Sequence, residues 1–316
     1  MEERESIARR IPAVSTKKRA FSGRLIPLRG PVRSHAICCL NSRMPLCSLT
    51  VTKTVVGGNV SGFLANMRAA WRIFLLVPWT CGVFSLAIIV RPFIKMASSH
   101  ADVRFRSAMV RLWARVALRI GGFRLTINGE PPRHHCFTVS NHLSSIDSVV
   151  ICAVIGGVFV ARHDMARWPL IGFMSRHVDI IFVNRQRRTD VGDINERIAD
   201  ALHKGYAVHM FAESRIGDGK TVLPFKPALL EPAVQAGMPV HYATLGYLTK
   251  PNDPTPMQSV HWGPDVPFAN HILGILRLRG GEASMKFGAE PVAGTDRKQL
   301  AADLWEKVQK QFVPLE

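Results

Sequence analysis

Residues 136–155 read CFTVSNHLSSIDSVVICAVI, and this stretch contains a strand signal, a polar turn and a helix signal in that order. Cys136–Ser140 is a short apolar run of strand-forming residues, and residues 145–155 are apolar over a length typical of a helix. A strand that leads through a short turn into a helix is the repeating unit of an α/β fold. The stretch therefore predicts the fold class of the domain that contains it.

The same alternation extends in both directions, from about residue 123 to the end of the chain. We expect strands at residues 123–127, 136–140, 158–161, 180–184, 208–212, 240–245 and 283–287, and helices near residues 145–155, 167–176, 189–204, 226–237, 267–278 and 296–312. Short apolar runs between helical segments indicate an α/β domain, with a central, mostly parallel sheet flanked by helices. We expect this domain to span residues 122–316.

Upstream, residues 67–121 are expected to form two membrane-associating helices. Residues 73–90 are eighteen uncharged residues, and a helix of this length spans roughly 27 Å, about the thickness of a hydrocarbon layer. Residues 101–120 have an apolar face and a basic one, a pattern typical of a membrane interface; the two faces are Phe105, Met109, Leu112, Trp113, Val116 and Ile120, and Arg104, Arg111, Arg115 and Arg119. The alternatives are a buried core helix and a core-facing helix with a solvated basic face.

The chain is strongly basic, with 41 Lys and Arg against 23 Asp and Glu and a net charge of +18. Residues 1–66 carry eleven Lys and Arg but only three acids and show no periodicity, so we expect a poorly ordered basic extension; a transit peptide also stays open. A basic chain prefers nucleic acid or an anionic membrane. The apolar helix favours the membrane, and no nucleic-acid-binding motif is present, so a nucleic-acid partner is not expected. The six cysteines form no CxxC pair, which favours a reducing compartment.

The polar turn within residues 136–155 carries the strongest catalytic signal, His142 followed five residues later by Asp147. On one continuous helix these side chains would be about 140° apart. We therefore expect His142 in the strand-to-helix turn and Asp147 in the first helical turn, folding back toward it. The carboxylate would then hold the imidazole tautomer, leaving the other ring nitrogen to take a proton from a hydroxyl. The alternative is an aspartate that caps the helix beside a structural histidine.

Three later blocks place polar residues at the boundaries of strand-like runs: FVNR at 182–185, FAESRIGDG at 211–219 and MPV at 238–240. Ligands bind at the carboxyl ends of strands in an open α/β sheet, so Arg185, Arg215 and His142 are expected to converge on one cleft. Together with NHLSSID, the blocks resemble in kind and order the NHxxxxD, FVxR, FPEGTR and VPV motifs of the glycerophospholipid acyltransferase superfamily, specifically its 1-acylglycerol-3-phosphate O-acyltransferases. The resemblance covers about residues 70–312.

The resemblance implies transfer of a fatty acyl group from acyl-CoA or acyl carrier protein to the free hydroxyl of lysophosphatidate, giving phosphatidic acid. It implies His142 as general base and Asp147 as the residue that orients it. No metal or cofactor is expected, because the spacing of His134, His135, Cys136 and His142 matches no zinc site. Arg185, Arg162 and Arg215 are the expected phosphate ligands, and Glu213 the expected organiser of that basic cluster. The enzyme would work among membrane lipids, with its catalytic domain on the cytoplasmic side of the inner or plasma membrane.

The third block departs from the family pattern. Ala212 replaces Pro, Ser214 replaces Gly, and Arg215 takes the place of Thr, so that Ile216 stands at the usual Arg position. This departure leaves open another lyso-acceptor, such as lyso-ornithine lipid. The alternative from a different functional class is a non-catalytic module that binds anionic lipid. The intact pair of His142 and Asp147 argues against this alternative.

Overall fold

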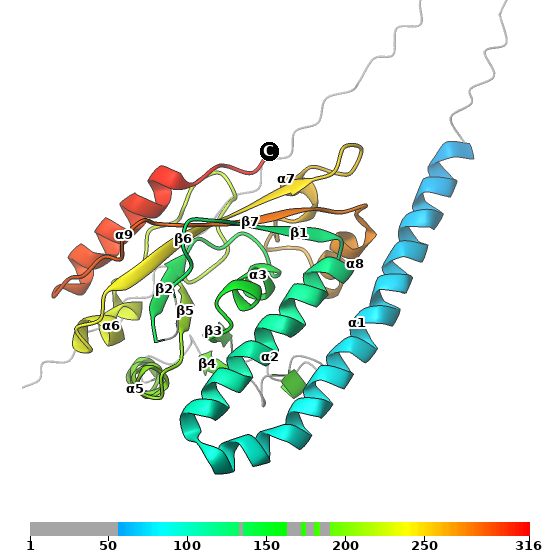
Figure 1. Ribbon diagram of the computed structural model, residues 1–316. Coiled ribbons are helices and arrows are strands. Elements are labelled where there is room, and N and C mark those ends of the chain that lie inside the picture. Colours follow the sequence, from blue (N-terminus) through cyan, green and yellow to red (C-terminus); the bar gives the residue numbers. More distant parts are fainter. Residues whose placement is uncertain (1–55, 133–134, 163–171, 175–179, 184–189) are drawn as a thin grey trace, which may run out of the picture. The chain divides into compact units, whose positions relative to one another are not determined.

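The computed structural model describes residues 56–132, 135–162, 172–174, 180–183 and 190–316. Within these ranges a seven-stranded sheet has the order β1-β7-β6-β2-β5-β3-β4 (Figure 1). Its strands are β1 (Phe123–Asn128), β2 (Phe137–Ser140), β3 (Val158–Arg162), β4 (Ile181–Val183), β5 (Val208–Phe211), β6 (Val240–Thr249) and β7 (Gly281–Phe287). All neighbours pair in parallel except β6 with β7. The predicted mostly parallel sheet is therefore confirmed.

The described helices of this domain include α3 (Asp147–Val154), α5 (Asp190–His203), α6 (Glu231–Gln235), α7 (Pro256–Ser259), α8 (Phe268–Arg277) and α9 (Arg297–Gln311). The helix predicted at 226–237 is wrong as one element, because the chain forms a 3₁₀ turn, η2 (Pro227–Leu229), and then α6. Pro227 and Pro232 explain the break, since proline lacks an N–H and fits only the first turn of a helix. Most of the helix predicted at 167–176 lies outside the described residues.

The central strands bring two loops to one edge of the sheet. β2 and β5 are buried along their whole length, as strands covered on both faces should be. Ser140, the last residue of β2, pairs with Phe211 of β5 and with Ala243 of β6. Because all three strands run in parallel, the loop after β2 and the loop after β5 leave the sheet side by side.

Two long helices, α1 (Val56–Ala97) and α2 (Ser99–Ile120), form an antiparallel hairpin beside this domain (Figure 1). Trp113 of α2 donates its indole N–H to Thr80 Oγ1 at 3.0 Å and accepts the indole N–H of Trp79 on its carbonyl at 3.2 Å. Arg91 and Asp102 form an ion pair at 2.9 Å near the turn. α1 begins upstream of residue 67, so the expected boundary there falls inside a helix.

α1 turns most of its apolar side chains outward. Among the described residues it is the one helix long and apolar enough to cross a membrane, by length and composition. Trp71, Phe74, Ile89 and Phe93 are between 60% and 71% exposed. A core helix would bury such side chains, so of the two interpretations left open by the sequence, the membrane-associating one fits.

α2 differs from the sequence expectation in which face it buries. Leu112, assigned to the apolar face, is 54% exposed, whereas Val103, Val110, Ala114 and Leu118 are buried. The basic residues are also not all solvated. Arg115 donates to the Ala153 carbonyl at 2.8 Å and Arg111 to the Ile155 carbonyl at 3.2 Å, both at the end of α3. Two of the four arginines thus satisfy carbonyl groups that a helix end leaves without partners.

Candidate active site

His142 and Asp147 are brought together as the spacing predicts. His142 lies in the turn after β2, and Asp147 is the first residue of α3. The distance from His142 Nδ1 to Asp147 Oδ2 is 2.7 Å. The His142 side chain is 18% exposed while Asp147 is fully buried. The pair therefore has a carboxylate out of contact with solvent behind a partly accessible imidazole.

Asp147 accepts hydrogen bonds from three further groups. The backbone N–H groups of Leu143 and Ser144 donate to Oδ2 at 2.6 and 2.8 Å, and the Tyr247 hydroxyl donates to Oδ1 at 2.5 Å. The carboxylate thus binds the loop that precedes it and does not cap the first turn of α3. Because a carboxylate only accepts hydrogen bonds, His142 donates from Nδ1, which leaves Nε2 as the proton-accepting nitrogen.

Tyr247 is a site residue that the sequence analysis missed. It lies on β6, a hundred residues downstream of Asp147 and beyond the strand expected at residues 240–245. Burial and the neighbouring Asp147 carboxylate raise the pKa of Tyr247 well above its usual value, so its phenol stays protonated and remains a donor. The side chain is 5% exposed, and its function is visible only in the folded chain.

Two further contacts position the turn that carries His142. Its imidazole stacks on the Phe211 ring with centroids 3.8 Å apart and planes 13° from parallel. The Asn141 side chain bonds the backbone of Leu245 in both directions, accepting at 2.7 Å and donating at 3.1 Å. The turn after β2 is thereby fastened to the end of β5 and to the middle of β6, the strands that flank β2.

Glu213 holds the two loops together. Its carboxylate accepts the His142 N–H at 2.8 Å and the Leu223 N–H at 2.9 Å, and the side chain is buried. Burial raises the pKa of Glu213 to about 7. The described contacts of Glu213 are therefore with backbone amides, one of them that of His142, whereas the sequence analysis expected it to organise a cluster of arginines.

The altered third block has a strained position. Ser214 has a φ of +63°, the left-handed conformation that glycine adopts freely and other residues adopt at a cost. Three residues later, Gly217 donates its backbone N–H to the His142 carbonyl at 3.0 Å. This loop therefore keeps the conformation that the usual glycine would allow, and it returns to bond the turn that carries His142.

The arginines expected to bind phosphate stay predictions. Arg215 is exposed on the altered loop, and no contact within the described part of the chain joins it to His142. Arg162 ends β3, where only the backbone is described, and Arg185 lies outside the described residues.

A second layer of side chains supports the turn from α8 and the segment before it. His271 of α8 lies 3.3 Å from Ser144 Oγ through its Nε2, and its ring stacks on Trp262. The backbone N–H of Trp262 donates to the Leu143 carbonyl at 3.1 Å. Burial lowers the pKa of His271 to about 4, so this imidazole is neutral at physiological pH. The sequence analysis missed this layer as well.

Comparison with known proteins gives a consistent result. The model of the family described as Acyltransferase matches residues 124–244. A lyso-ornithine lipid O-acyltransferase of Brucella abortus (strain 2308) is 31% identical over 259 residues, which cover 75% of this chain and 92% of that protein. A 1-acyl-sn-glycerol-3-phosphate acyltransferase of Neisseria gonorrhoeae is 34% identical over 136 residues, covering 42% and 52%.

A solved structure shows the same fold. The crystal structure of a 1-acyl-sn-glycerophosphate acyltransferase, PlsC, from Thermotoga maritima aligns with a TM-score of 0.50 and 18% identity. The alignment covers 76% of this chain and 97% of that one. It therefore includes helices and strands well beyond the residues matched by the family model.

Proposed function

Because the chain belongs to the glycerophospholipid acyltransferase family and is an acyltransferase of the lysophospholipid type, we propose that His142 is the general base of acyl transfer to a lyso-lipid hydroxyl. The observation that carries this proposal is the 2.7 Å contact between His142 and the buried Asp147. That contact leaves the other imidazole nitrogen free to accept a proton, at the edge of the sheet where α/β proteins bind ligands.

The reaction needs no covalent enzyme intermediate. His142 Nε2 takes the proton of the acceptor hydroxyl as its oxygen attacks the carbonyl carbon of an acyl thioester. The tetrahedral intermediate then collapses, the C–S bond breaks, and the imidazolium returns its proton to the leaving thiolate. Asp147 stabilises the imidazolium while the charge is present, and a positioned base of this kind contributes roughly 10²–10⁴-fold in rate.

For the acceptor, we propose lyso-ornithine lipid as the first candidate. The lyso-ornithine lipid O-acyltransferase of Brucella abortus aligns over 92% of its own length, whereas the Neisseria enzyme aligns over 52%. The third block also supports this choice, since Ile216 stands where the family usually has the arginine. An acceptor without a phosphate has no need of that guanidinium.

Lysophosphatidate is the second candidate. The identity of 34% to the Neisseria enzyme over 136 residues supports it. Arg162, Arg185 and Arg215 are the candidate phosphate ligands on this chain. The donor in either case is an acyl thioester, acyl-CoA or acyl carrier protein, and α1 attaches the enzyme to the membrane, with the domain on the cytoplasmic side.

Release of free thiol tests the proposal. Purified protein would be assayed with lyso-ornithine lipid and lysophosphatidate, each with both donor types. We expect kcat/KM for lyso-ornithine lipid to exceed that for lysophosphatidate at least tenfold. The reverse ratio establishes the second candidate, and no thiol release with any pair indicates the non-catalytic lipid-binding module.

The base itself is tested by His142→Ala, with the exposed His203→Ala as matched control. The first variant should retain less than about a tenth of the wild-type kcat, because a general base contributes more than that. The second should be unchanged. If His142→Ala, shown to be folded by circular dichroism, keeps more than that fraction, His142 is not the base.

A further inference from the structure

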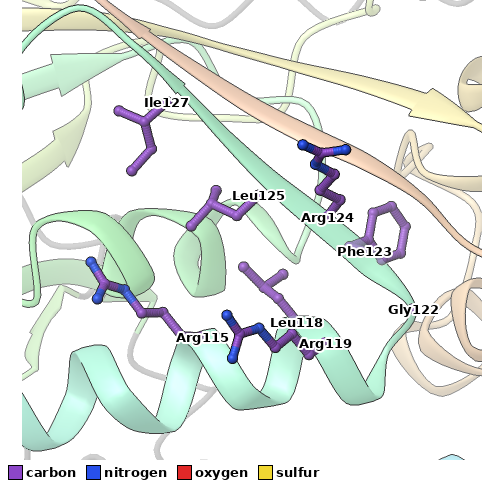
Figure 2. Close-up of a pocket in the computed structure, with 8 residues that line it drawn as sticks. All are labelled: Arg115, Leu118, Arg119, Gly122, Phe123, Arg124, Leu125 and Ile127. Carbon is purple, nitrogen blue, oxygen red and sulfur yellow. The ribbon is translucent and has the colours of Figure 1, made fainter.

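A pocket of about 580 Å³ lies between the C-terminal half of α2 and β1 (Figure 2). It belongs to no motif of the active site. Its lining consists of Arg115, Leu118, Arg119, Gly122, Phe123, Arg124, Leu125 and Ile127. The volume is within the range of roughly 300–1,000 Å³ that is usual for small-molecule sites.

The pocket combines an apolar floor with cationic groups. Leu118 and Phe123 are only 4% and 3% exposed, and Leu125 and Ile127 extend from β1 toward α2 (Figure 2). Arg119 is exposed on the α2 side. No carboxylate is among the lining residues. A pocket of this kind fits an amphiphile with an anionic head, because guanidinium groups bind phosphate oxygens and the floor excludes water from the apolar part.

The two arginines of α2 that line the pocket, Arg115 and Arg119, differ in their contacts with the protein. Arg115 already donates its Nε–H to the Ala153 carbonyl at 2.8 Å, so only its terminal nitrogens are available to a ligand. Arg124 lines the pocket but extends to the other side of β1 from Leu125, as alternation along a strand requires (Figure 2). Arg119 is therefore the candidate anion ligand of the site, and Arg104, which is exposed on the same helix and outside the lining, offers a control of equal charge.

The position of the pocket points to the bilayer as the source of its ligand. At one end it is bounded by Gly122, where an added Cβ would meet the Arg72 guanidinium of α1. Arg72 in turn donates to the carbonyls of Leu276 and Leu278 at 3.0 and 2.7 Å. The neighbouring Trp71 and Phe74 of α1 are 60% and 64% exposed. The pocket thus borders the part of the hairpin that presents apolar side chains.

We propose that this pocket binds the phosphate head group of an anionic phospholipid of the bilayer, with Arg119 on the phosphate and the apolar floor against the first part of the acyl chain. Such a site is separate from that of acyl transfer. The two are connected through Phe123, whose ring lies edge-on to Tyr247 at 6.4 Å, and Tyr247 donates to Asp147. A bound membrane lipid would therefore sit two side chains from the catalytic pair without occupying it.

Native mass spectrometry of the full chain in detergent, without acyl donor, tests the site. The probes are phosphatidylglycerol and phosphatidylcholine with identical chains. Phosphatidylglycerol should bind with a dissociation constant that rises roughly tenfold or more in Arg119→Gln, as expected for loss of a charge-assisted hydrogen bond. Arg104→Gln should leave it within about twofold. Phosphatidylcholine should bind more weakly and respond to neither change.

A second variant keeps the test independent of charge. Ile127→Trp places a larger side chain in the pocket at a position that is 37% exposed, and it should weaken phosphatidylglycerol binding while Arg119 is intact. Equal losses in the two glutamine variants would show a diffuse surface effect and overturn the proposal, as would equal affinity for the two lipids. Displacement of phosphatidylglycerol by excess lyso-ornithine lipid or lysophosphatidate would show that the pocket is part of the acceptor site. The proposed acyl transfer can be right in each of these cases.

Discussion

Single residues of the catalytic turn act chiefly through the hydrogen bonds that orient them. Asp147 has four partners, of which one is His142, two are backbone amides of the intervening turn, and one is the Tyr247 hydroxyl. Glu213 adds a fifth constraint by accepting the His142 N–H. The geometry of the proposed base, His142, is therefore determined by groups from β6 and from the loop after β5 as well as by the motif itself.

Tyr247→Phe should lower kcat roughly tenfold and leave both KM values nearly unchanged. The variant removes the donor to Asp147 Oδ1, and a buried acceptor left without a donor costs about 1–3 kcal/mol. Steady-state kinetics with each substrate varied in turn measure the effect. Tyr242→Phe is the matched control, because Tyr242 lies on the opposite face of the same strand. Equal losses in kcat for the two variants would contradict an orienting role for Tyr247.

Ser214→Gly should stabilise the protein by up to about 1 kcal/mol, because the left-handed conformation costs a side-chain-bearing residue roughly 1–2 kcal/mol and glycine gives back part of this as backbone entropy. Thermal unfolding in detergent measures the change. Ala212→Gly in the same loop should have the opposite sign, since Ala212 is buried and has no positive φ. A destabilised Ser214→Gly variant would show that the serine side chain compensates for its backbone.

Among the elements, the α1–α2 hairpin connects two different environments. α1 presents exposed apolar side chains along most of its length, while α2 buries one stripe against the domain and places two arginines on the end of α3. Contacts from Arg68 and Arg72 to carbonyls at the end of α8 fix the hairpin to the domain. The hairpin is consequently part of the folded domain, and its exposed apolar side chains are the proposed site of membrane attachment.

A chain that begins at Val56 should float with liposomes as fully as the complete chain, and one that begins at Phe123 should not. α1 is the one helix in the described residues that is apolar and long enough to cross a membrane. The chain that begins at Phe123 also exposes the surface that α2 covers, so its folding is checked by circular dichroism first. Full flotation of this shorter, folded chain would place the anchor elsewhere.

Over the whole molecule, the C-terminal residues close on the loop that carries Glu213. The Leu315 N–H donates to the Gly219 carbonyl at 2.9 Å, and the Met257 N–H donates to the carbonyl of Glu316 at 3.1 Å. Leu315 is 7% exposed, whereas Val313 is 73% exposed. The end of the chain thus supports a loop nearly a hundred residues upstream, which in turn bonds His142.

Leu315→Ala should lower the free energy of unfolding by about 2 kcal/mol or more, as expected for a buried leucine. Val313→Ala, in the same tail, should change it by less than about 0.5 kcal/mol. Denaturant unfolding in detergent compares the two variants. If they destabilise equally, the tail does not pack in solution as it does here, and its support of the catalytic loop is absent.

Local patterns were enough to predict the α/β class, every strand of the described sheet and the turn-to-helix placement of His142 and Asp147. These features depend on residues close in sequence, where strand and helix periodicity and a five-residue spacing constrain the backbone directly. The sequence analysis expected one helix near residues 226–237 and missed the break between η2 and α6. Pro227 and Pro232 interrupt the helix there.

Only the tertiary structure decided which distant side chains complete the site. The sequence analysis assigned no role to Tyr247 or His271, whose side chains, like the backbone N–H of Trp262, reach the turn that carries His142 because parallel strands end at one edge and α8 packs beside it. Likewise, the buried face of α2 is set by its contacts with both α1 and α3. The periodicity of a single apolar face does not predict burial against two neighbours. The physical reason is the same in each case: hydrogen bonds and packing across a hundred residues follow from the sheet order, and no local spacing determines that order.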